Sequence, residues 1–240
     1  MSGAATFDFA GERFLMLADR ALFWPARGAL IVADMHLEKA SWYAAQGQPL
    51  PPYDSHDTLD RLARIADETQ ACAIWCLGDS FHDGDAATRI APSVAERLAQ
   101  QSKRTKLVWV AGNHDGLSGG AWGGEVAEEL VDSGIVFRHQ CQAGESRPEI
   151  SGHFHPKLRI NLRGRGVSRP CFAGDSRRLI LPAFGSFTGG LDVEDCAIAL
   201  NFGGSYRAML VAQNRLLALP CENPTGGDAT AADIAATRRD

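Results

Sequence analysis

Four short polar motifs, each placed directly after an apolar run, constrain this chain more than any other feature of its sequence. In order they are Asp34-Met35-His36, Gly78-Asp79 with His82-Asp83, Gly112-Asn113-His114-Asp115 and Gly152-His153-Phe154-His155. The preceding runs read as buried strands, because apolar residues occupy both of their faces. Strand ends that deliver carboxylate, imidazole and amide groups are what a two-metal hydrolytic centre needs, in which two cations roughly 3.5–4 Å apart hold the reacting oxygens.

The spacing within the motifs adds detail. Alternation along an extended backbone predicts that Asp34 and His36 point to the same side, and the same holds for His153 and His155. Gly78 is expected to let the backbone turn sharply or approach the metals closely.

Each motif alone has a simpler explanation. A single histidine is usually a core or surface residue, and Asn-His-Asp by itself is more often a turn. Five of the seven histidines, however, lie in or beside these motifs. Their repeated occurrence directly after strand-like runs favours a metal centre.

The ordered motifs resemble those of the calcineurin-like metallophosphoesterases, and the resemblance extends from about Ala29 to Val193. Four stretches are similar to one subgroup, the ligase-associated DNA-damage-response endonucleases of the PdeM type: 33–40, 78–83, 151–157 and 182–191. The resemblance implies an α/β fold built as a four-layer αββα sandwich, with two mixed β-sheets flanked by helices.

The resemblance also implies a ligand set. One metal would be held by Asp34, His36, Asp79 and His155. The second would be held by Asp79, Asn113, His139 and His153, with Asp79 bridging the two. His139 follows the run 135–137 without a glycine nearby, so a solvated or hydrogen-bonded histidine remains an alternative there. His56 lies beside Asp54 and Asp57 at an expected helix start, where capping is the better interpretation.

A ligand set without thiolate suits two divalent ions, with Mn²⁺ preferred and Fe²⁺ or Zn²⁺ as alternatives. In the family such a centre supplies a metal-bridging hydroxide that attacks phosphorus. His114 is implied to stabilise the transition state and to protonate the leaving oxygen. The common family pattern has an Asp three residues after the bridging Asp, whereas this chain has His82 there and Asp83 one residue later. Whether Asp83, Asp115 or another acid orients His114 is open at this stage.

The composition fits a cytoplasmic enzyme. With 240 residues, 45% of them hydrophobic, the chain is expected to form a single domain over residues 1–221. Residues 222–240 are rich in Gly, Ala, Thr and Asp and are expected to be a disordered tail. The sequence has no evident signal peptide, no run long enough to span a membrane, and six scattered cysteines, which favours a reducing compartment.

The apolar patterns predict the following elements. Strands are expected at 6–9, 13–17, 22–24, 158–162, 170–173, 179–181, 196–200, 207–211 and 216–219, in addition to the runs before the motifs. Helices are expected at 37–45, 53–69 and 86–101. Residues 161–166 read as a mobile Gly/Arg loop.

Basic residues are concentrated after the last motif, although the net charge is −5. Between Lys157 and Arg178 there are seven basic residues and one acidic residue, Asp175. We interpret this stretch as a cationic lip beside the metals, with Arg163 and Arg165 contacting substrate; a solvated strand edge is an equal alternative. Stacking on nucleic-acid bases is one possible role for Trp42, Tyr43 and Trp122, and packing against helices is the more common one.

These observations predict a dinuclear metal-dependent phosphodiesterase or endonuclease that cleaves single-stranded or flapped DNA during repair. The name of the subgroup also implies a functional association with a DNA ligase, a helicase and an exonuclease. Two alternatives stay open: a phosphohydrolase of a small nucleotide, lipid precursor or phosphoprotein, and a non-catalytic scaffold of the same fold.

Overall fold

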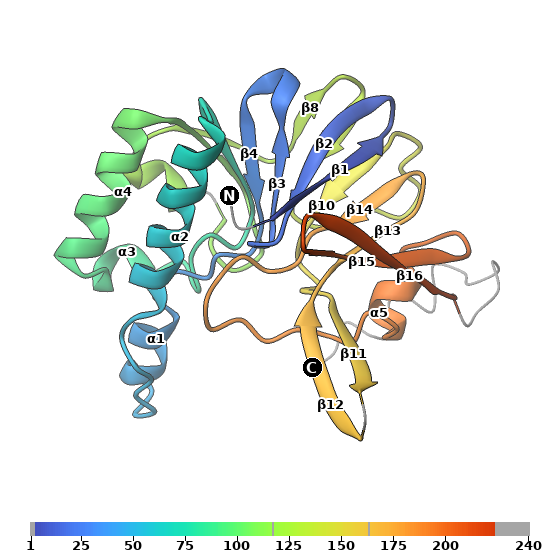
Figure 1. The fold of residues 1–240 in the computed structure, drawn as a ribbon. Helices are drawn as coiled ribbons and strands as arrows, with labels where there is room; N and C mark the ends of the chain where they lie inside the picture. Colours follow the sequence, from blue (N-terminus) through green and yellow to red (C-terminus); the bar gives the residue numbers. More distant parts are fainter. Residues whose placement is uncertain (1–2, 117, 163, 224–240) are drawn as a thin grey trace.

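The structure is a computed structural model, and it describes residues 3–116, 118–162 and 164–223. Within these residues two seven-stranded β-sheets face each other, and helices lie on both sides of the pair (Figure 1). The fold class predicted from the motifs is therefore confirmed. A separate two-stranded hairpin projects from the body beside the second sheet (Figure 1).

The first sheet holds the strands that precede the first three motifs. Its strands follow the chain in the order β1 (Ala4–Phe9), β2 (Glu12–Leu17), β3 (Ala21–Trp24), β4 (Ala29–Val32), β5 (Ala73–Leu77), β6 (Lys106–Val110) and β7 (Glu125–Ala127). Neighbours from β1 to β4 are antiparallel, and those from β4 to β7 are parallel. The parallel half brings the carboxyl ends of β4, β5 and β6 to one edge.

The second sheet holds the strand that precedes the fourth motif. Its order is β16 (Arg215–Cys221), β15 (Tyr206–Ala212), β13 (Phe172–Gly174), β14 (Arg178–Ile180), β10 (Glu149–Ser151), β9 (Ile135–Phe137) and β8 (Leu130–Asp132). Strands β9, β10 and β14 are parallel, and the other neighbours are antiparallel. The hairpin consists of β11 (Lys157–Leu162) and β12 (Arg165–Pro170).

Three buried apolar clusters separate the four layers. The first lies between one face of the first sheet and helices α2 (Asp54–Thr69) and α4 (Pro92–Arg104), the second lies between the two sheets, and the third lies between the second sheet and α5 (Cys196–Ala199). Helices α1 (Lys39–Ala45) and α3 (Ala86–Arg89) lie on the side of the first sheet (Figure 1). Single-turn 3-10 helices occur at Pro25–Arg27 and Ser118–Trp122.

Several predicted elements differ from the structure. The helix expected over 86–101 is two helices, because Ala91 is extended before Pro92, as the residue before a proline prefers. The strand expected at 196–200 is helix α5, since the carboxylate of Asp195 accepts a hydrogen bond from the backbone N–H of Ala197 at 2.9 Å and caps a helical turn.

The loop expected at 161–166 is wrong for most of its length: Asn161 and Leu162 end β11, and Arg165 and Gly166 begin β12, a strand that the sequence pattern did not predict. The strand expected at 170–173 straddles the boundary between β12 and β13. Of the predicted tail, residues 224–240 lie outside the described part of the chain. No helix in the described part has both the length and the apolar character needed to cross a bilayer.

Candidate metal centre

The ends of five strands converge on one site. Asp34 and His36 follow β4, Asp79 follows β5, Asn113 and His114 follow β6, His139 follows β9, and His153 and His155 follow β10. The structure therefore brings all seven predicted metal ligands together from both sheets, with His114 beside them. Their role as ligands remains a prediction.

The backbone at these positions is unusual. Asp34, His36 and Asp79 have φ of 55°, 45° and 45°, and His153 and His155 have φ of 75° and 49°. Side-chain-bearing residues rarely adopt this left-handed conformation, and such strain is concentrated at functional sites. Hydrogen bonds hold it in place: Asp34 N–H donates to Gly78 O at 3.2 Å, and His36 N–H donates to Asp79 O at 2.9 Å.

The extended alternation predicted for Asp34 and His36 is therefore wrong, although both side chains reach the site. Strand β4 ends at Val32, and the left-handed turns after it set the direction of both side chains instead. The same correction applies to the pair after β10, His153 and His155.

One group of potential ligands consists of Asp34, His36 and His155. The Nε2 atoms of the two histidines are 3.3 Å apart, and Asp34 Oδ1 lies 3.4 Å from His155 Nε2. Asp34 is fully buried, and its Oδ1 has no hydrogen-bond partner, whereas Oδ2 accepts the backbone N–H of His153 at 2.9 Å. An orphaned buried carboxylate oxygen is costly, so a bound cation fits this position.

A second group consists of Asp79, His139 and His153. His139 Nε2 is 3.0 Å from His153 Nδ1, 3.4 Å from Asp79 Oδ2 and 2.8 Å from the side-chain oxygen of Asn113. On the other side of the ring, Nδ1 of His139 lies 3.1 Å from the carbonyl of Leu77. A proton on Nδ1 that is donated to this carbonyl leaves Nε2 free for a metal.

Asp79 connects the two groups. Its Oδ2 is 3.4 Å from His139 Nε2 in the second group and 3.9 Å from His36 Nε2 in the first. A carboxylate that reaches both groups is the arrangement expected of the bridging ligand.

The protonation of the histidines reflects their burial and their neighbours. Burial lowers the pKa of His36 to about 3 and that of His153 to about 4. Burial also disfavours the charged form of His139, but the hydrogen bond to Asp79 and the charges of Asp34 and Asp79 outweigh it and raise the pKa to about 9. His139 and Asp79 thus form an ion pair in the metal-free protein, and a cation would take the place of the proton.

Glycine is required where these loops meet. Gly78 has φ of 75°, and a Cβ there would lie 2.4 Å from Nδ1 of His139. A Cβ on Gly112 would lie 2.1 Å from the backbone nitrogen of Asp79. The sharp turn predicted for Gly78 agrees with this left-handed conformation, and both contacts leave no space for a side chain.

His114 lies at the edge of the site. Its side chain is 46% exposed, its Nε2 is 3.8 Å from Asp79 Oδ2, and its backbone N–H donates to Asp79 Oδ1 at 3.0 Å. The ring is thus beside both ligand groups but belongs to neither, as the predicted proton donor requires.

Neither acid considered from the sequence contacts the His114 ring in the described part of the chain. Asp83 pairs with Arg89. Asp115 is buried and accepts the backbone N–H groups of Phe81 at 3.0 Å and Gly112 at 3.2 Å, so it fixes two site loops to each other. The contact that the sequence did not predict is His82, whose ring is stacked on His114 with centroids 5.8 Å apart.

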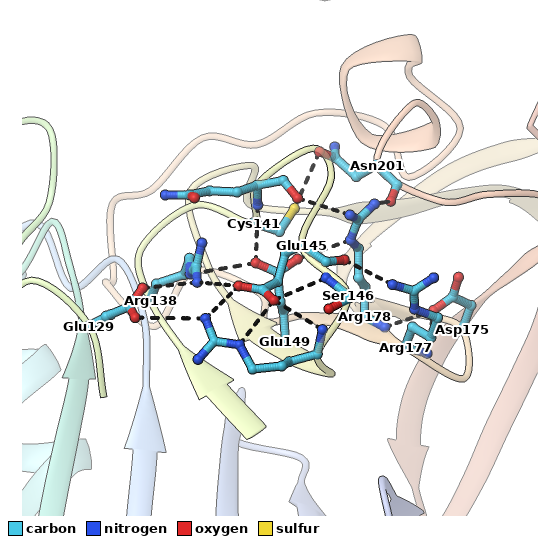
Figure 2. Close-up of polar contacts among 12 residues, drawn as sticks. Glu129, Arg138, Cys141, Glu145, Ser146, Glu149, Asp175, Arg177, Arg178 and Asn201 are labelled. Atoms are coloured by element: carbon cyan, nitrogen blue, oxygen red, sulfur yellow. Dashed lines mark hydrogen bonds and ion pairs between the residues drawn. The ribbon is translucent and has the colours of Figure 1, made fainter. Parts of the chain in front are cut away.

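A partly buried ionic network surrounds Arg138, the residue before His139 in the sequence (Figure 2). Arg138 is 6% exposed and pairs with Glu129 at 2.9 Å and Glu145 at 3.1 Å, and its Nε lies 3.5 Å from Glu149. The fully buried Glu149 also accepts Arg178 Nε at 3.1 Å. The network fixes the residue before His139, and no local sequence pattern indicated it because its members come from separate loops and strands.

The predicted cationic lip is only partly assembled. Arg165 is exposed at the tip of the hairpin, and Arg163 lies outside the described residues. By register, Lys157 and Arg159 share one face of the hairpin, and Arg165 and Arg169 share the other. Arg177 and Arg178 do not belong to the lip, because Arg178 joins the network of Figure 2 and Arg177 donates to the carbonyl of Glu145.

The aromatic residues singled out from the sequence have two different surroundings. Trp42 and Tyr43 on α1 are half-buried and lie against His82, with ring centroids at 5.1 and 6.2 Å. Trp122 packs against Phe81 and the first apolar cluster. His56 lies in the first turn of α2, away from the ligand groups, and the capping role expected for it is wrong, because its Nε2 faces Ser93 Oγ on α4 at 3.3 Å.

Comparisons with known proteins agree with this geometry. The family model of the calcineurin-like phosphoesterases matches residues 29–233. The crystal structure of Pseudomonas putida nuclease MPE has a TM-score of 0.70 and 32% sequence identity, and the match covers 90% of this chain and 100% of that one.

A second solved structure, the phosphoesterase YfcE from E. coli, has a TM-score of 0.40 and 12% sequence identity. That match covers 80% of this chain and 97% of the other chain. No curated protein sequence matches the chain significantly. The family match and the nuclease structure together show that the chain belongs to the calcineurin-like phosphoesterases and is a metal-dependent hydrolase of phosphate esters.

Proposed function

We propose that this protein is a dinuclear metal-dependent phosphodiesterase that cleaves DNA as an endonuclease. The observation that carries the proposal is the pair of ligand groups, Asp34–His36–His155 and Asp79–His139–His153, with Asp79 Oδ2 within 3.9 Å of a histidine nitrogen from each. One cation in each group would give the paired metal centre that catalyses phosphodiester hydrolysis in dinuclear enzymes.

We propose Mn²⁺ as the native ion, with Fe²⁺ or Zn²⁺ as alternatives. The two groups offer imidazole nitrogens and carboxylate oxygens, with the amide oxygen of Asn113 beside the second, and no thiolate. Such a donor set suits Mn²⁺, Fe²⁺ or Zn²⁺. When bound, the two ions would supply an activated water and neutralise charge on the phosphate.

The residues of the chain contribute position and a proton. The carboxyl groups of Asp34 and Asp79 are buried, one in each ligand group, and they fix where the cations would sit. His114 is half-exposed beside Asp79, where Nε2 can hold a proton for the departing oxygen of the substrate. The backbone N–H of His114 donates to Asp79 Oδ1, and this hydrogen bond holds the imidazole of His114 beside the proposed metal ligands.

Two observations support a nucleic-acid substrate. The solved structure that matches with 32% identity is described as a nuclease, and this chain covers that protein completely. The hairpin after the fourth motif carries Lys157, Arg159, Arg165 and Arg169 within the described residues, and Arg163 belongs to the same segment. Basic residues of this kind bind phosphates in a sequence-independent way.

A single-stranded or flapped DNA is the substrate form that we propose, with a role in DNA repair. A functional association with a DNA ligase, a helicase and an exonuclease belongs to the same proposal. All six cysteines lie in the described part of the chain and are free thiols, which supports a reducing compartment such as the cytoplasm.

The test compares four substrates with Mn²⁺, Fe²⁺, Zn²⁺ or no added metal: a chromogenic phosphodiester, the matching monoester, single-stranded DNA and duplex DNA. We expect turnover of the diester and of single-stranded DNA with Mn²⁺, and loss of both in Asp79→Asn. Turnover of the monoester alone would instead indicate a phosphohydrolase of small substrates. No turnover with any ion, despite bound metal, would indicate a scaffold.

A further inference from the structure

His82 occupies a central place among the aromatic rings of the site. It comes three residues after Asp79, and its backbone N–H donates to Leu37 O at 2.9 Å, which ties its loop to the first motif. Its ring is parallel to that of His114, with an interplanar angle of 12° and centroids 5.8 Å apart, and it stacks on Tyr43 at 20° and 6.2 Å. The rings of Trp42 and His82 are nearly perpendicular, with centroids 5.1 Å apart.

His82 also faces His36, one of the proposed ligands. The Nδ1 atoms of the two rings are 3.5 Å apart. The other ring nitrogen of His36, Nε2, faces His155 Nε2 at 3.3 Å and Asp79 Oδ2 at 3.9 Å. The His36 ring therefore has one nitrogen directed to the ligand group and one directed to His82.

This arrangement fixes how hydrogen atoms must be distributed. If Nε2 of His36 binds a cation, its Nδ1 must carry the hydrogen, and this N–H needs an acceptor. His82 Nδ1 can accept it when the hydrogen of His82 is on Nε2. A partner of this kind orients a ligand histidine and selects its tautomer.

The ring of His82 also lies against the ring of His114. Within the described residues the carboxylate paired with His114 is Asp79, while Asp83 pairs with Arg89 and Asp115 accepts backbone N–H groups. Apart from Asp79, the ring of His114 lies against two imidazoles, His82 at 5.8 Å and His36 at 5.4 Å.

We propose that His82 is a positioning residue with two separable actions: its Nδ1 fixes the tautomer of His36 for metal binding, and its ring face holds His114 in place for proton transfer. The proposal rests on the proposed function, since it takes His36 as a metal ligand. The family pattern has an aspartate three residues after the bridging aspartate, whereas this chain has His82 there. We therefore propose that the imidazole of His82 orients His114 in place of a carboxylate.

Two substitutions separate the actions. His82→Phe keeps a flat ring against His114 but removes the acceptor for His36. His82→Asn keeps an acceptor near the position of Nδ1 but removes most of the ring. For His82→Phe we expect Mn²⁺ binding in the first group to weaken by about 10- to 100-fold, with kcat close to wild type at saturating Mn²⁺. For His82→Asn we expect Mn²⁺ affinity close to wild type and kcat lower by a similar factor.

The readouts are Mn²⁺ titration by calorimetry, kcat on a chromogenic phosphodiester at saturating Mn²⁺, and thermal midpoints. His56→Ala is the matched control, because this histidine lies outside the site and should change none of them. In a His114→Ala background His82→Asn should cause no further loss of kcat, since its effect passes through His114. Equal losses of affinity and kcat in both variants, or no loss in either, would overturn the proposal.

A measurement on the unaltered protein covers the case in which the variants fold poorly. Nitrogen-15 NMR of the Zn²⁺-loaded wild type should show His36 protonated at Nδ1 and His82 protonated at Nε2. Hydrogen on Nδ1 of His82 would overturn the proposal. A wild-type protein that binds fewer than two ions would contradict the proposed function itself, and so the two failures are distinguishable.

Discussion

Asp79 links the backbone of His114 to both ligand groups through its two carboxylate oxygens. Oδ1 accepts the backbone N–H of His114 at 3.0 Å, and Oδ2 lies 3.4 Å from His139 Nε2 and 3.9 Å from His36 Nε2. One side chain thus sets the position of the proposed proton donor relative to both proposed cations. Because the tie to His114 runs through the backbone, the imidazole can be removed without breaking it.

His114→Ala should therefore abolish turnover while both metal ions stay bound. We expect kcat on a phosphodiester to fall by about 10²- to 10⁴-fold, the usual contribution of a positioned acid. The check is steady-state kinetics together with elemental analysis of the purified variant. Unchanged turnover would remove His114 from its proposed role, and loss of metal would make it a ligand instead.

Arg163→Ala combined with Arg165→Ala should weaken cleavage of single-stranded DNA and spare a small chromogenic diester. Loss of two phosphate contacts should also reduce the slope of log affinity against log salt by about 1.4. Arg215→Ala, at an exposed position on β16, is the control and should behave as wild type. Equal loss on both substrates would argue against a role of the hairpin in binding the polymer.

Much of the fold could be predicted because the strands of both sheets are short apolar runs. The first three strands and the helix over 54–69 were predicted within one or two residues. The errors have physical causes. Pro92 divides a helical pattern, Asp195 caps a turn in a stretch that is apolar enough for a strand, and β12 has too few apolar residues to be recognised.

The site was predictable in its members but not in its geometry. The order of motifs identified the residues that converge, yet the left-handed backbone at Asp34, His36 and Asp79 depends on hydrogen bonds between separate strand ends. The stack of His82 on His114 likewise joins two loops that are far apart along the chain. Contacts of this kind leave no periodic trace in a single sequence.

Glu149→Ala should destabilise the protein and weaken the second ligand group. The substitution removes a fully buried partner of Arg178 and Arg138, and breaking such a pair costs about 3–5 kcal/mol, which is on the order of a 10 °C fall in Tm. Glu96→Ala, on the exposed face of α4, should stay within about 0.5 kcal/mol of wild type. Equal thermal midpoints for the two variants would show that the network of Figure 2 does not stabilise the folded protein.

The metal-free protein should be most stable near neutral pH. Burial lowers the pKa of His36 to about 3 and that of His153 to about 4, so between these values and about 6.5 the unfolded chain binds more protons and stability rises with pH. The pKa of His139 is raised to about 9, because its interactions with Asp79 and Asp34 outweigh its burial. Between about 6.5 and 9 the folded state therefore binds more protons, and stability falls as pH rises.

Thermal midpoints in EDTA from pH 4.5 to 9.5 test this expectation. The curve should pass through a maximum, and the falling limb should flatten in His139→Gln. A midpoint that keeps rising from pH 7 to pH 9 would contradict the ion pair between His139 and Asp79.

The most direct test of the account is a crystal of the protein grown with Mn²⁺ and measured for anomalous scattering. We expect two peaks roughly 3.5–4 Å apart, one contacted by Asp34, His36 and His155 and the other by Asp79, His139 and His153, with Asp79 touching both. A single peak, or two peaks that do not share Asp79, would contradict a dinuclear centre.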